Sequence, residues 1–381
     1  MQDLSEIRAR IDSIDSQISQ LLIERMEVSG AVAAYKKESG KAVYDPTRER
    51  ANLAAAAERV PPELANYATV IQSVLMEASR EAQNKYLGRS SMAAAELGAA
   101  LQFSPTMFPK HAHVACQGVE GAYQQIACDR MFSRPRLTFY DKFEGVFEAV
   151  EQGLCDFGVL PIENSTAGSV NHVYDLMMRH EFHIVRTCRL KIDHNLLVKP
   201  GTKKKDVRIV YSHQQAISQC ADYIAAIPNC QVHVCENTAK AAEMVSRFSR
   251  QDVAAIASRT CAELYGLEIA DQSVQDNQNN YTRFACISKD LVVYPGADRS
   301  SLMIVTSNEP GSLYKVLACF YALDINLIKL ESRPIPDRNF EWMFYFDIEC
   351  AAASPEFRAL MDALTDVCES FRYLGSYNEV I

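Results

Sequence analysis

The first 87 residues contain cations that could hold a small dianion. Arg25 occupies a position where an apolar repeat otherwise places Ile, Leu or Val. Such an arginine can also be a snorkelling side chain or a polar residue that fixes helix register. Lys36 lies about 20° round the same helix face, at about 100° per residue. Arg8 lies about 100° away, so it could share that pocket only from a second copy of the chain.

Other polar side chains accompany these cations. Ser79 and Gln83 form an i, i+4 pair on one face of a later helix. Arg48 and Glu49 lie at the start of the helix between them. Because the segment contains neither His nor Cys, any chemistry here must depend on electrostatics and shape.

Three motifs in the middle of the chain could form a second site. Pro161-Ile162-Glu163-Asn164-Ser165 follows an apolar run, Ser212-His213 follows another, and Asn280-Tyr281-Thr282-Arg283-Phe284 comes later. Alone, each is typical of a turn or a structural ion pair. In α/β sheets ligands bind beyond the carboxyl ends of strands, which is where two of these motifs lie.

The polar and charged residues of the first 87 positions are expected to lie on helices. The apolar repeat predicts a helix over residues 3–39, about 55 Å long at 1.5 Å per residue. A compact module of 90 residues cannot cover such a rod alone, so we expect an antiparallel or intertwined dimer. The repeat consists of Leu4, Ile7, Ile11, Ile14, Ile18, Leu21, Val28, Val32 and Tyr35.

Two shorter helices are expected to follow. Asp45-Pro46 resembles an N-cap with proline at the first helical position, opening a helix to about Arg59. Pro61-Pro62 ends it, and a third helix is expected over 63–87. Residues 88–111, rich in small residues and prolines, are interpreted as a linker.

Short apolar runs then alternate with helical stretches, which indicates an α/β sheet covered on both faces. Helices are expected over 143–152, 213–226 and 238–249. The expected buried strands are Val114–Cys116, Cys155–Leu160, Leu196–Val198, Arg208–Tyr211 and Val253–Ala257.

The last module reads as βαββαβ, a ferredoxin-like α+β unit. Strands are expected over 301–306, 325–330 and 342–349, with a Pro-rich turn at 334–336 and a short strand at the end of the chain. A helix is expected over 312–323. Ser354-Pro355 should open a final helix to about Ser370.

Composition narrows the class of protein. The chain has 381 residues and a net charge of −9, with no long basic run, which argues against nucleic acid as a partner. It has no stretch of about 18 apolar residues and a polar N-terminus, so we expect no membrane contact and a cytoplasmic location. The twelve cysteines include no C-x-x-C pair and are expected to be reduced core thiols, with reactive or metal-bound thiols the open alternative.

Residues 1–90 resemble the intertwined, all-helical chorismate mutase module. The resemblance implies that Lys36 and Gln83 donate to the ether oxygen of chorismate and that Glu49 accepts the substrate hydroxyl. It places eight residues at substrate-binding positions: Arg8, Arg25, Lys36, Asp45, Arg48, Glu49, Ser79 and Gln83.

Residues 112–290 resemble prephenate dehydratase, which implies two periplasmic-binding-like α/β lobes with the active cleft between them. Thr282 matches the essential threonine and is expected to donate or relay a hydrogen bond, with Glu163 as a candidate acid. Arg283 would supply a cation for the carboxylates. Other cleft positions are Asn164, Ser212, Gln219 and Phe284. The chain departs from the pattern at Ala122, Gln124 and Gln214.

Residues 300–378 resemble the ACT regulatory domain. Glu331-Ser332-Arg333-Pro334 matches its Glu-Ser-Arg-Pro motif, and Gly311-Ser312-Leu313-Tyr314 matches its Gly-Ala-Leu-Val motif at Gly311 and Leu313. Both segments can also be ordinary turns of a ferredoxin-like fold. The resemblance implies that the residues from Gly311 to Leu313 and the turn Glu331–Pro334 bind phenylalanine as an effector.

Together the resemblances imply conversion of chorismate through prephenate to phenylpyruvate by a homodimer or larger homo-oligomer, without a metal or other cofactor. Two alternatives stay open. The second module could prefer arogenate, or it could be an amino-acid sensor without turnover.

Overall fold

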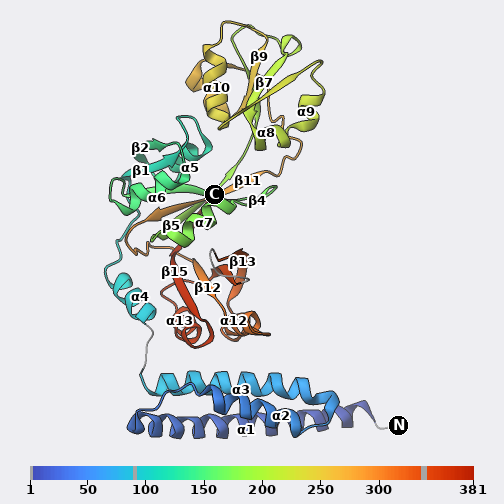
Figure 1. Ribbon diagram of the computed structural model, residues 1–381, viewed down its shortest axis with the longest axis vertical. Helices are drawn as coiled ribbons and strands as arrows, with labels where there is room; N and C mark the ends of the chain where they lie inside the picture. Colours follow the sequence, from blue (N-terminus) through green and yellow to red (C-terminus); the bar gives the residue numbers. More distant parts are fainter. Residues whose placement is uncertain (1–2, 89–91, 336–340) are drawn as a thin grey trace. The chain divides into compact units, whose positions relative to one another are not determined.

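The computed structural model describes residues 3–88, 92–335 and 341–381 (Figure 1). The chain forms two compact units. The first comprises Met1–Glu96, Gly311–Cys319 and Arg358–Cys368, and the second comprises Leu97–Pro310, Phe320–Phe357 and Glu369–Ile381.

The N-terminal module consists of helices, as predicted. They are α1 (Leu4–Ser39), α2 (Pro46–Glu58), a 3₁₀ turn η1 (Pro62–Leu64) and α3 (Ala65–Tyr86). The carboxylate of Asp45 accepts a hydrogen bond from the backbone N–H of Arg48 at 3.0 Å, so Asp45 is the N-cap of α2 and Pro46 its first residue. Gly40 ends α1 in the left-handed conformation that glycine adopts without strain.

The predicted apolar repeat lies on the exposed side of α1. Its members are 39–63 % exposed, with Val32 the least exposed and Leu21 the most. Exposed apolar residues also occur along α3, including Tyr67, Val70 and Ile71. A single chain therefore leaves a long apolar surface in contact with water, which is unusual for a globular protein.

The segment 88–111, interpreted from the sequence as a linker, contains a helix that the sequence analysis did not predict. Residues 92–102 form helix α4 (Met92–Gln102), while residues 89–91 lie outside the described residues. The segment is composed mostly of Ala, Leu, Met, Glu and Gln, which are strong helix formers. The prediction gave too much weight to the flanking serines and prolines and to the missing apolar period.

The first α/β lobe is built on a seven-stranded sheet with the order β16-β5-β11-β3-β1-β2 and β4 paired to β3. Helices α5 (Tyr123–Met131), α6 (Phe143–Glu151) and α7 (Asn171–Arg179) belong to it. Its strands are β1 (His111–Gln117), β2 (Arg134–Tyr140), β3 (Phe157–Asn164), β4 (Gly168–Ser169), β5 (His183–Lys191), β11 (Tyr281–Ser288) and β16 (Glu379–Val380).

The second lobe has a five-stranded sheet with the order β10-β6-β9-β7-β8. The strands are β6 (Asn195–Val198), β7 (Ile209–His213), β8 (Gln231–Cys235), β9 (Val253–Ala257) and β10 (Glu268–Asp271). The helices are α8 (Gln214–Gln219), α9 (Ala221–Ala225), α10 (Thr238–Arg247) and α11 (Arg259–Tyr265). All five strands predicted in the two lobes are present, and so are the predicted helical windows. The strands that were missed, such as β5 and β8, interrupt their apolar residues with charged or polar ones.

The C-terminal module has the predicted βαββαβ order. It consists of β12 (Arg299–Val305), α12 (Ser312–Ala322), β13 (Asn326–Pro334), β14 (Trp342–Glu349), α13 (Pro355–Val367) and β15 (Ser370–Tyr377). The antiparallel sheet order is β13-β14-β12-β15. Glu331–Pro334 was expected to be a turn, but these residues belong to β13 and pair with β14. Part of the expected turn at 334–336 lies outside the described residues.

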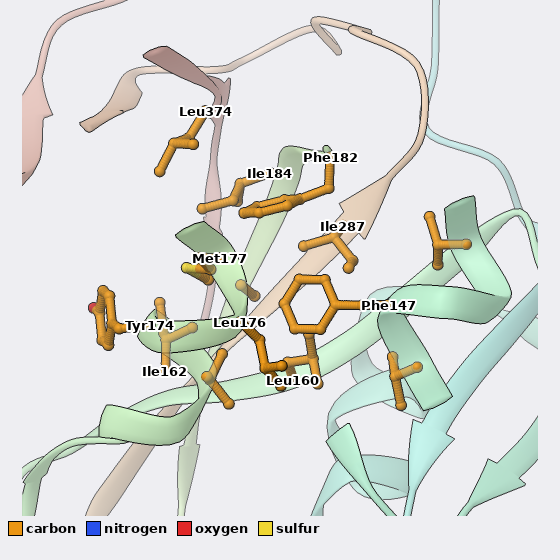
Figure 2. Close-up of a cluster of buried hydrophobic side chains, with 14 of the residues drawn as sticks. Phe147, Leu160, Ile162, Tyr174, Leu176, Met177, Phe182, Ile184, Ile287 and Leu374 are labelled. Atoms are coloured by element: carbon orange, nitrogen blue, oxygen red, sulfur yellow. The ribbon is translucent and has the colours of Figure 1, made fainter. Parts of the chain in front are cut away.

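The C-terminal sheet shares a hydrophobic core with the first lobe. Leu374 of β15 belongs to the same buried cluster as Leu160, Ile184 and Phe147 (Figure 2). The end of the chain joins that lobe directly, because β16 pairs with β5 in parallel. At Gly375 (φ +126°) a Cβ would lie 2.2 Å from the carbonyl oxygen of Ile184, so only glycine allows this approach of β15 to β5.

All twelve cysteines are free thiols, and most are buried. Burial raises the pKa of several of them, for example that of Cys188 to about 11, which keeps that thiol protonated and unreactive. No helix in the described ranges is both long and apolar enough to cross a membrane.

Candidate active sites

Two of the predicted cations in the helical module lie on its inner side. Arg25 donates hydrogen bonds to the hydroxyl of Ser79 and to the carbonyl oxygen of Leu75, the latter at 2.6 Å. Lys36 donates to the carbonyl oxygen of Val43 at 2.6 Å. Partial burial lowers the pKa of Lys36, against the opposing attraction of two nearby carboxylates, Asp45 and Glu49.

The sequence interpretation overlooked Arg80. Its guanidinium forms an ion pair with Glu49 and is almost fully buried, with its charge also facing the ring of Tyr44 at 5.5 Å. The buried residues of α3 recur at i, i+3, i+4 and i+7, and Arg80 occupies the i+4 position between Ser79 and Gln83. That spacing was visible in the sequence and could have revealed it.

Gln83 carries an unmet hydrogen-bonding atom. Its side chain is buried, and its Oε1 is inaccessible to water and has no hydrogen-bond partner among the described residues. Arg8 and Arg48 are both exposed. Arg8 is 17 residues from Arg25 along α1, about 25 Å at 1.5 Å per residue, so within one chain it cannot reach the other cations.

A cavity of about 390 Å³ in the second unit is lined by residues of both α/β lobes. Four predicted cleft residues line it: Asn164, Gln219, Thr282 and Phe284. Three do not, namely Glu163, Ser212 and Arg283. The hydroxyl of Ser212 is fully buried and donates to the carbonyl oxygen of Ile256 at 2.6 Å.

The hydrogen bonds around Asn164 orient the hydroxyl of Thr282. Backbone N–H groups of Thr166 and Ala167 donate to Oδ1 of Asn164 at 3.1 and 2.9 Å, which fixes the orientation of its amide because N–H groups only donate. Its Nδ2 therefore donates to Oγ1 of Thr282 at 3.0 Å. Since no hydrogen bond within the described residues uses the Thr282 proton, that proton is free to donate into the cavity.

Arg283 lies on the opposite face of β11 from Thr282 and Phe284, as the alternation of a strand requires. Its buried guanidinium pairs with Asp347 of β14 and, at 3.2 Å, with Glu163. Glu163 also pairs with Lys329 of β13 at 3.2 Å. The expected roles of Arg283 as substrate cation and of Glu163 as acid are therefore not supported by their placement.

Gln219 connects the two lobes. Its Oε1 accepts from Asn280 at 3.0 Å and lies 3.0 Å from Nε2 of His194, while its Nε2 donates to Thr166 at 3.1 Å. His194 and His213 both line the cavity, and burial lowers the pKa of each. Both imidazoles are therefore neutral near pH 7.

Neither lysine nor arginine is among the described residues that line this cavity. Instead, the first residues of α5 and α10 face it, with Ala122 and Asn237 as their N-caps. Helix N-termini present free N–H groups and partial positive charge, which suits carboxylates. Glu236 also lines the cavity, and the sequence interpretation had not singled it out.

The predicted effector residues fall into two groups. Gly311 (φ +87°) precedes α12, which starts with Ser312 and Leu313, and a Cβ on Gly311 would meet no atom within 4 Å. In β13, Glu331 accepts from Ser169 at 2.7 Å and Arg333 donates to Asp175 at 2.7 Å, both in the first lobe. The alternate residues Ser332 and Pro334 are exposed.

No group of three or more His, Cys, Asp or Glu side chains in the described part of the chain could hold a metal ion.

Family models match two parts of the chain: chorismate mutase type II over residues 7–84 and prephenate dehydratase over residues 114–291. Arogenate dehydratase/prephenate dehydratase 1 of Arabidopsis thaliana is 37 % identical over 281 residues, which cover 69 % of this chain and 71 % of that protein. A bifunctional chorismate mutase/prephenate dehydratase of Enterobacter agglomerans is 29 % identical over 98 % of this chain and 95 % of its own.

Among solved structures, the prephenate dehydratase of Arthrobacter aurescens in complex with L-Phe superimposes with a TM-score of 0.64 at 25 % identity. The similarity covers 70 % of this chain and 89 % of that one. The order of modules, the cavity with Thr282 and the similarity over nearly the whole chain agree. The chain belongs to the family of bifunctional enzymes that join a type II chorismate mutase to a prephenate dehydratase.

Proposed function

We propose that the two reactions of this enzyme take place at two separate sites, one in the helical module and one in the cavity between the α/β lobes. The first rearranges chorismate to prephenate, and the second removes carbon dioxide and hydroxide from prephenate to give phenylpyruvate. The observation that supports this most strongly is the free hydroxyl proton of Thr282 at the wall of the cavity.

In the first site, Lys36 and Gln83 donate to the ether oxygen as it becomes negative, and Arg25 binds a carboxylate. Glu49 accepts the substrate hydroxyl while Arg80 holds its position by the ion pair. Partial burial strengthens each of these interactions, because a less polar environment screens the attraction between charges less than water does.

A matched pair of variants tests this site. Lys36→Ala should lower chorismate mutase turnover by about 10²–10³-fold, as does removal of an oxyanion donor. Lys37→Ala, which removes the same charge from an exposed neighbour, should leave turnover unchanged. Equal losses of turnover in the two variants would show that the net charge of α1 matters and that Lys36 has no specific role.

The first site is completed by a second copy of the chain. The exposed apolar repeat of α1 requires a cover, and an antiparallel or intertwined dimer supplies one of matching length. Arg8, which cannot reach Lys36 in its own chain, would then bind a carboxylate in the partner's site. Asp45 and Arg48 lie beside this site, at the start of α2.

In the second site, the hydroxyl of Thr282 donates to the departing hydroxyl of prephenate, and aromatisation drives the elimination. Asn164 positions this donor, while Gln219 and Phe284 form part of the wall. The carboxylates of prephenate bind the N-termini of α5 and α10 in place of an arginine. Arg283 lies on the other face of β11 and serves the structure of the strand.

Two alternatives for the second site can be separated by one assay. The Arabidopsis relative is named for both arogenate and prephenate, and arogenate differs from prephenate by an amino group in place of the keto group. We expect phenylpyruvate from chorismate and from prephenate, with turnover of arogenate much slower. Faster turnover of arogenate would make the module an arogenate dehydratase, and binding without any turnover would make it a sensor.

The C-terminal module is an ACT domain that binds phenylalanine as a feedback inhibitor. The βαββαβ order, the Gly311 turn and a dehydratase solved in complex with L-Phe support this. Gly311→Ala should weaken inhibition of the dehydratase by phenylalanine, because the methyl group would occupy the open space beside the turn. If a folded Gly311→Ala protein is inhibited at the same phenylalanine concentration as the parent, the effector binds elsewhere.

A further inference from the structure

The buried guanidinium of Arg283 connects three strands from two sheets. It lies on β11, directly between Thr282 and Phe284, and contacts Asp347 of β14 and Glu163 of β3. Only 8 % of its side chain is exposed, so its charge depends on these carboxylates. The placement puts a buried cation one residue from the catalytic hydroxyl and behind it.

The ladder between β11 and β3 is irregular at this point. Thr282 pairs with Asn164 and Arg283 with Glu163, but Phe284 then pairs with Pro161, so the register shifts between Arg283 and Phe284. Such a bulge weakens the backbone ladder and re-aims the side chains beside it. The ion pair between Arg283 and Glu163 lies at this bulge. Backbone hydrogen bonds alone fix the register of β11 against β3 least firmly there.

The carboxylate of Asp347 is held rigidly. Its Oδ2 contacts Arg283, and its Oδ1 accepts a hydrogen bond from Ser301 of β12 at 2.5 Å. The hydroxyl of Ser301 also lies 2.7 Å from that of Tyr377 of β15, which is 1 % exposed. Three strands of the C-terminal sheet therefore fix one carboxylate against the dehydratase strand.

We propose that Arg283 is a positioning residue of the dehydratase and that Asp347 of the C-terminal sheet holds it in place. This rests on the proposed role of Thr282. The ion pair fixes the register of β11 against β3 and so keeps Oγ1 of Thr282 within 3.0 Å of Nδ2 of Asn164. The C-terminal module thus contributes to the geometry of a catalytic site from which it is separated by the sheet.

Asp347→Asn tests this with the smallest change in shape. The variant keeps the acceptor for Ser301 and leaves Arg283 paired with Glu163, so the buried cation retains a partner. We expect the kcat for prephenate to fall between about tenfold and a hundredfold, as for a small misplacement of a catalytic group. KM should change by less than about threefold, since the walls that bind the substrate are untouched, and the mutase rate in the same chain should be unchanged.

Asp175→Asn is the matched control. It removes the carboxylate that Arg333 of β13 contacts, another ion pair between the C-terminal sheet and the first lobe, but one that does not involve β3 or β11. Its kcat should equal that of the parent. An equal fall in both variants would mean that the C-terminal sheet acts by general docking and would overturn the positioning role.

Two other results would contradict the proposal: an unchanged kcat in folded Asp347→Asn, or a raised KM at constant kcat. Where thermal melting shows Asp347→Asn to be unfolded, Ser301→Ala replaces it, since it frees the carboxylate without removing a charge, and a smaller fall in kcat is expected. Thr282→Val is run beside these variants. If Thr282→Val loses dehydration while Asp347→Asn keeps full activity, the positioning role alone is refuted. If Thr282→Val keeps full activity, the proposed dehydratase site is refuted.

Discussion

The amide of Asn164 donates a 3.0 Å hydrogen bond to the hydroxyl oxygen of Thr282 at the wall of the cavity. A hydroxyl that accepts from an amide keeps its own proton for another partner. The arrangement therefore makes the threonine a donor, which is what a departing hydroxyl group requires.

Reversing this hydrogen bond tests the polarity of the site. In Asn164→Asp, the atom that replaces the amide nitrogen can only accept, so Thr282 must donate to it and no longer donates into the cavity. We expect dehydratase kcat to fall by at least about tenfold, given that loss of one such donor costs about 10²–10³ in other enzymes. Asn171→Asp, which adds a carboxylate at an exposed position, is the control. Parent-like kcat in a folded Asn164→Asp protein would show that Thr282 does not act as a donor.

Much of the dehydratase site could be predicted from the sequence, but the sequence interpretation did not separate the residues on the two faces of β11. The motif Thr282-Arg283-Phe284 was assigned to the cleft as a whole. Successive residues of a strand point to opposite faces, so the side chains of three consecutive residues cannot all point into the cleft. The sequence interpretation had not placed this motif in a strand, and it could not foresee that Asp347, 64 residues away, would pair with Arg283.

Mixing two inactive variants tests the shared mutase site. Arg8→Ala and Lys36→Ala should each retain no more than about 1 % of the parent mutase activity, as for the loss of one such donor. After unfolding and refolding together, half of the dimers would be mixed, and each would have one site with Lys36 and the partner's Arg8 intact. About a quarter of parent activity should return by this arithmetic for a two-fold dimer. Absence of recovery, with dimers confirmed by light scattering, would place both residues in the same chain's site or outside it.

The cavity histidine His194 should make stability depend on pH. Its burial lowers its pKa below 6.5, with His213 acting in the same direction and Gln219 and Asp193 opposing. As pH falls from about 7 to 5, the unfolded chain binds a proton that the folded chain does not, so the free energy of unfolding decreases. His194→Asn should flatten this decrease in the thermal midpoint, whereas the exposed His111→Asn should not. An identical pH slope in His194→Asn and the parent would be inconsistent with a neutral buried imidazole.

Element types followed from local pattern where the pattern was strong. The apolar repeat predicted α1 to within one residue at its N-terminus, and Asp45-Pro46 predicted the start of α2. Helix α4 was missed because alanine-rich helices show no apolar period. The motif Glu331–Pro334 was taken for a turn because of its proline, but β13 is an edge strand, where proline at the end costs no ladder hydrogen bond.

The central claim is that two independent sites act in sequence, and the fate of prephenate in Thr282→Val tests it most directly. This variant keeps the shape of the side chain and replaces its hydroxyl with a methyl group. Supplied with chorismate, it should form prephenate at the parent rate and accumulate it, while phenylpyruvate formation falls by about 10²–10³-fold. Thr282→Ser should recover much of the loss. Phenylpyruvate formed by Thr282→Val at the parent rate would contradict the proposed dehydratase site, and loss of both activities together would contradict the separation of the two sites.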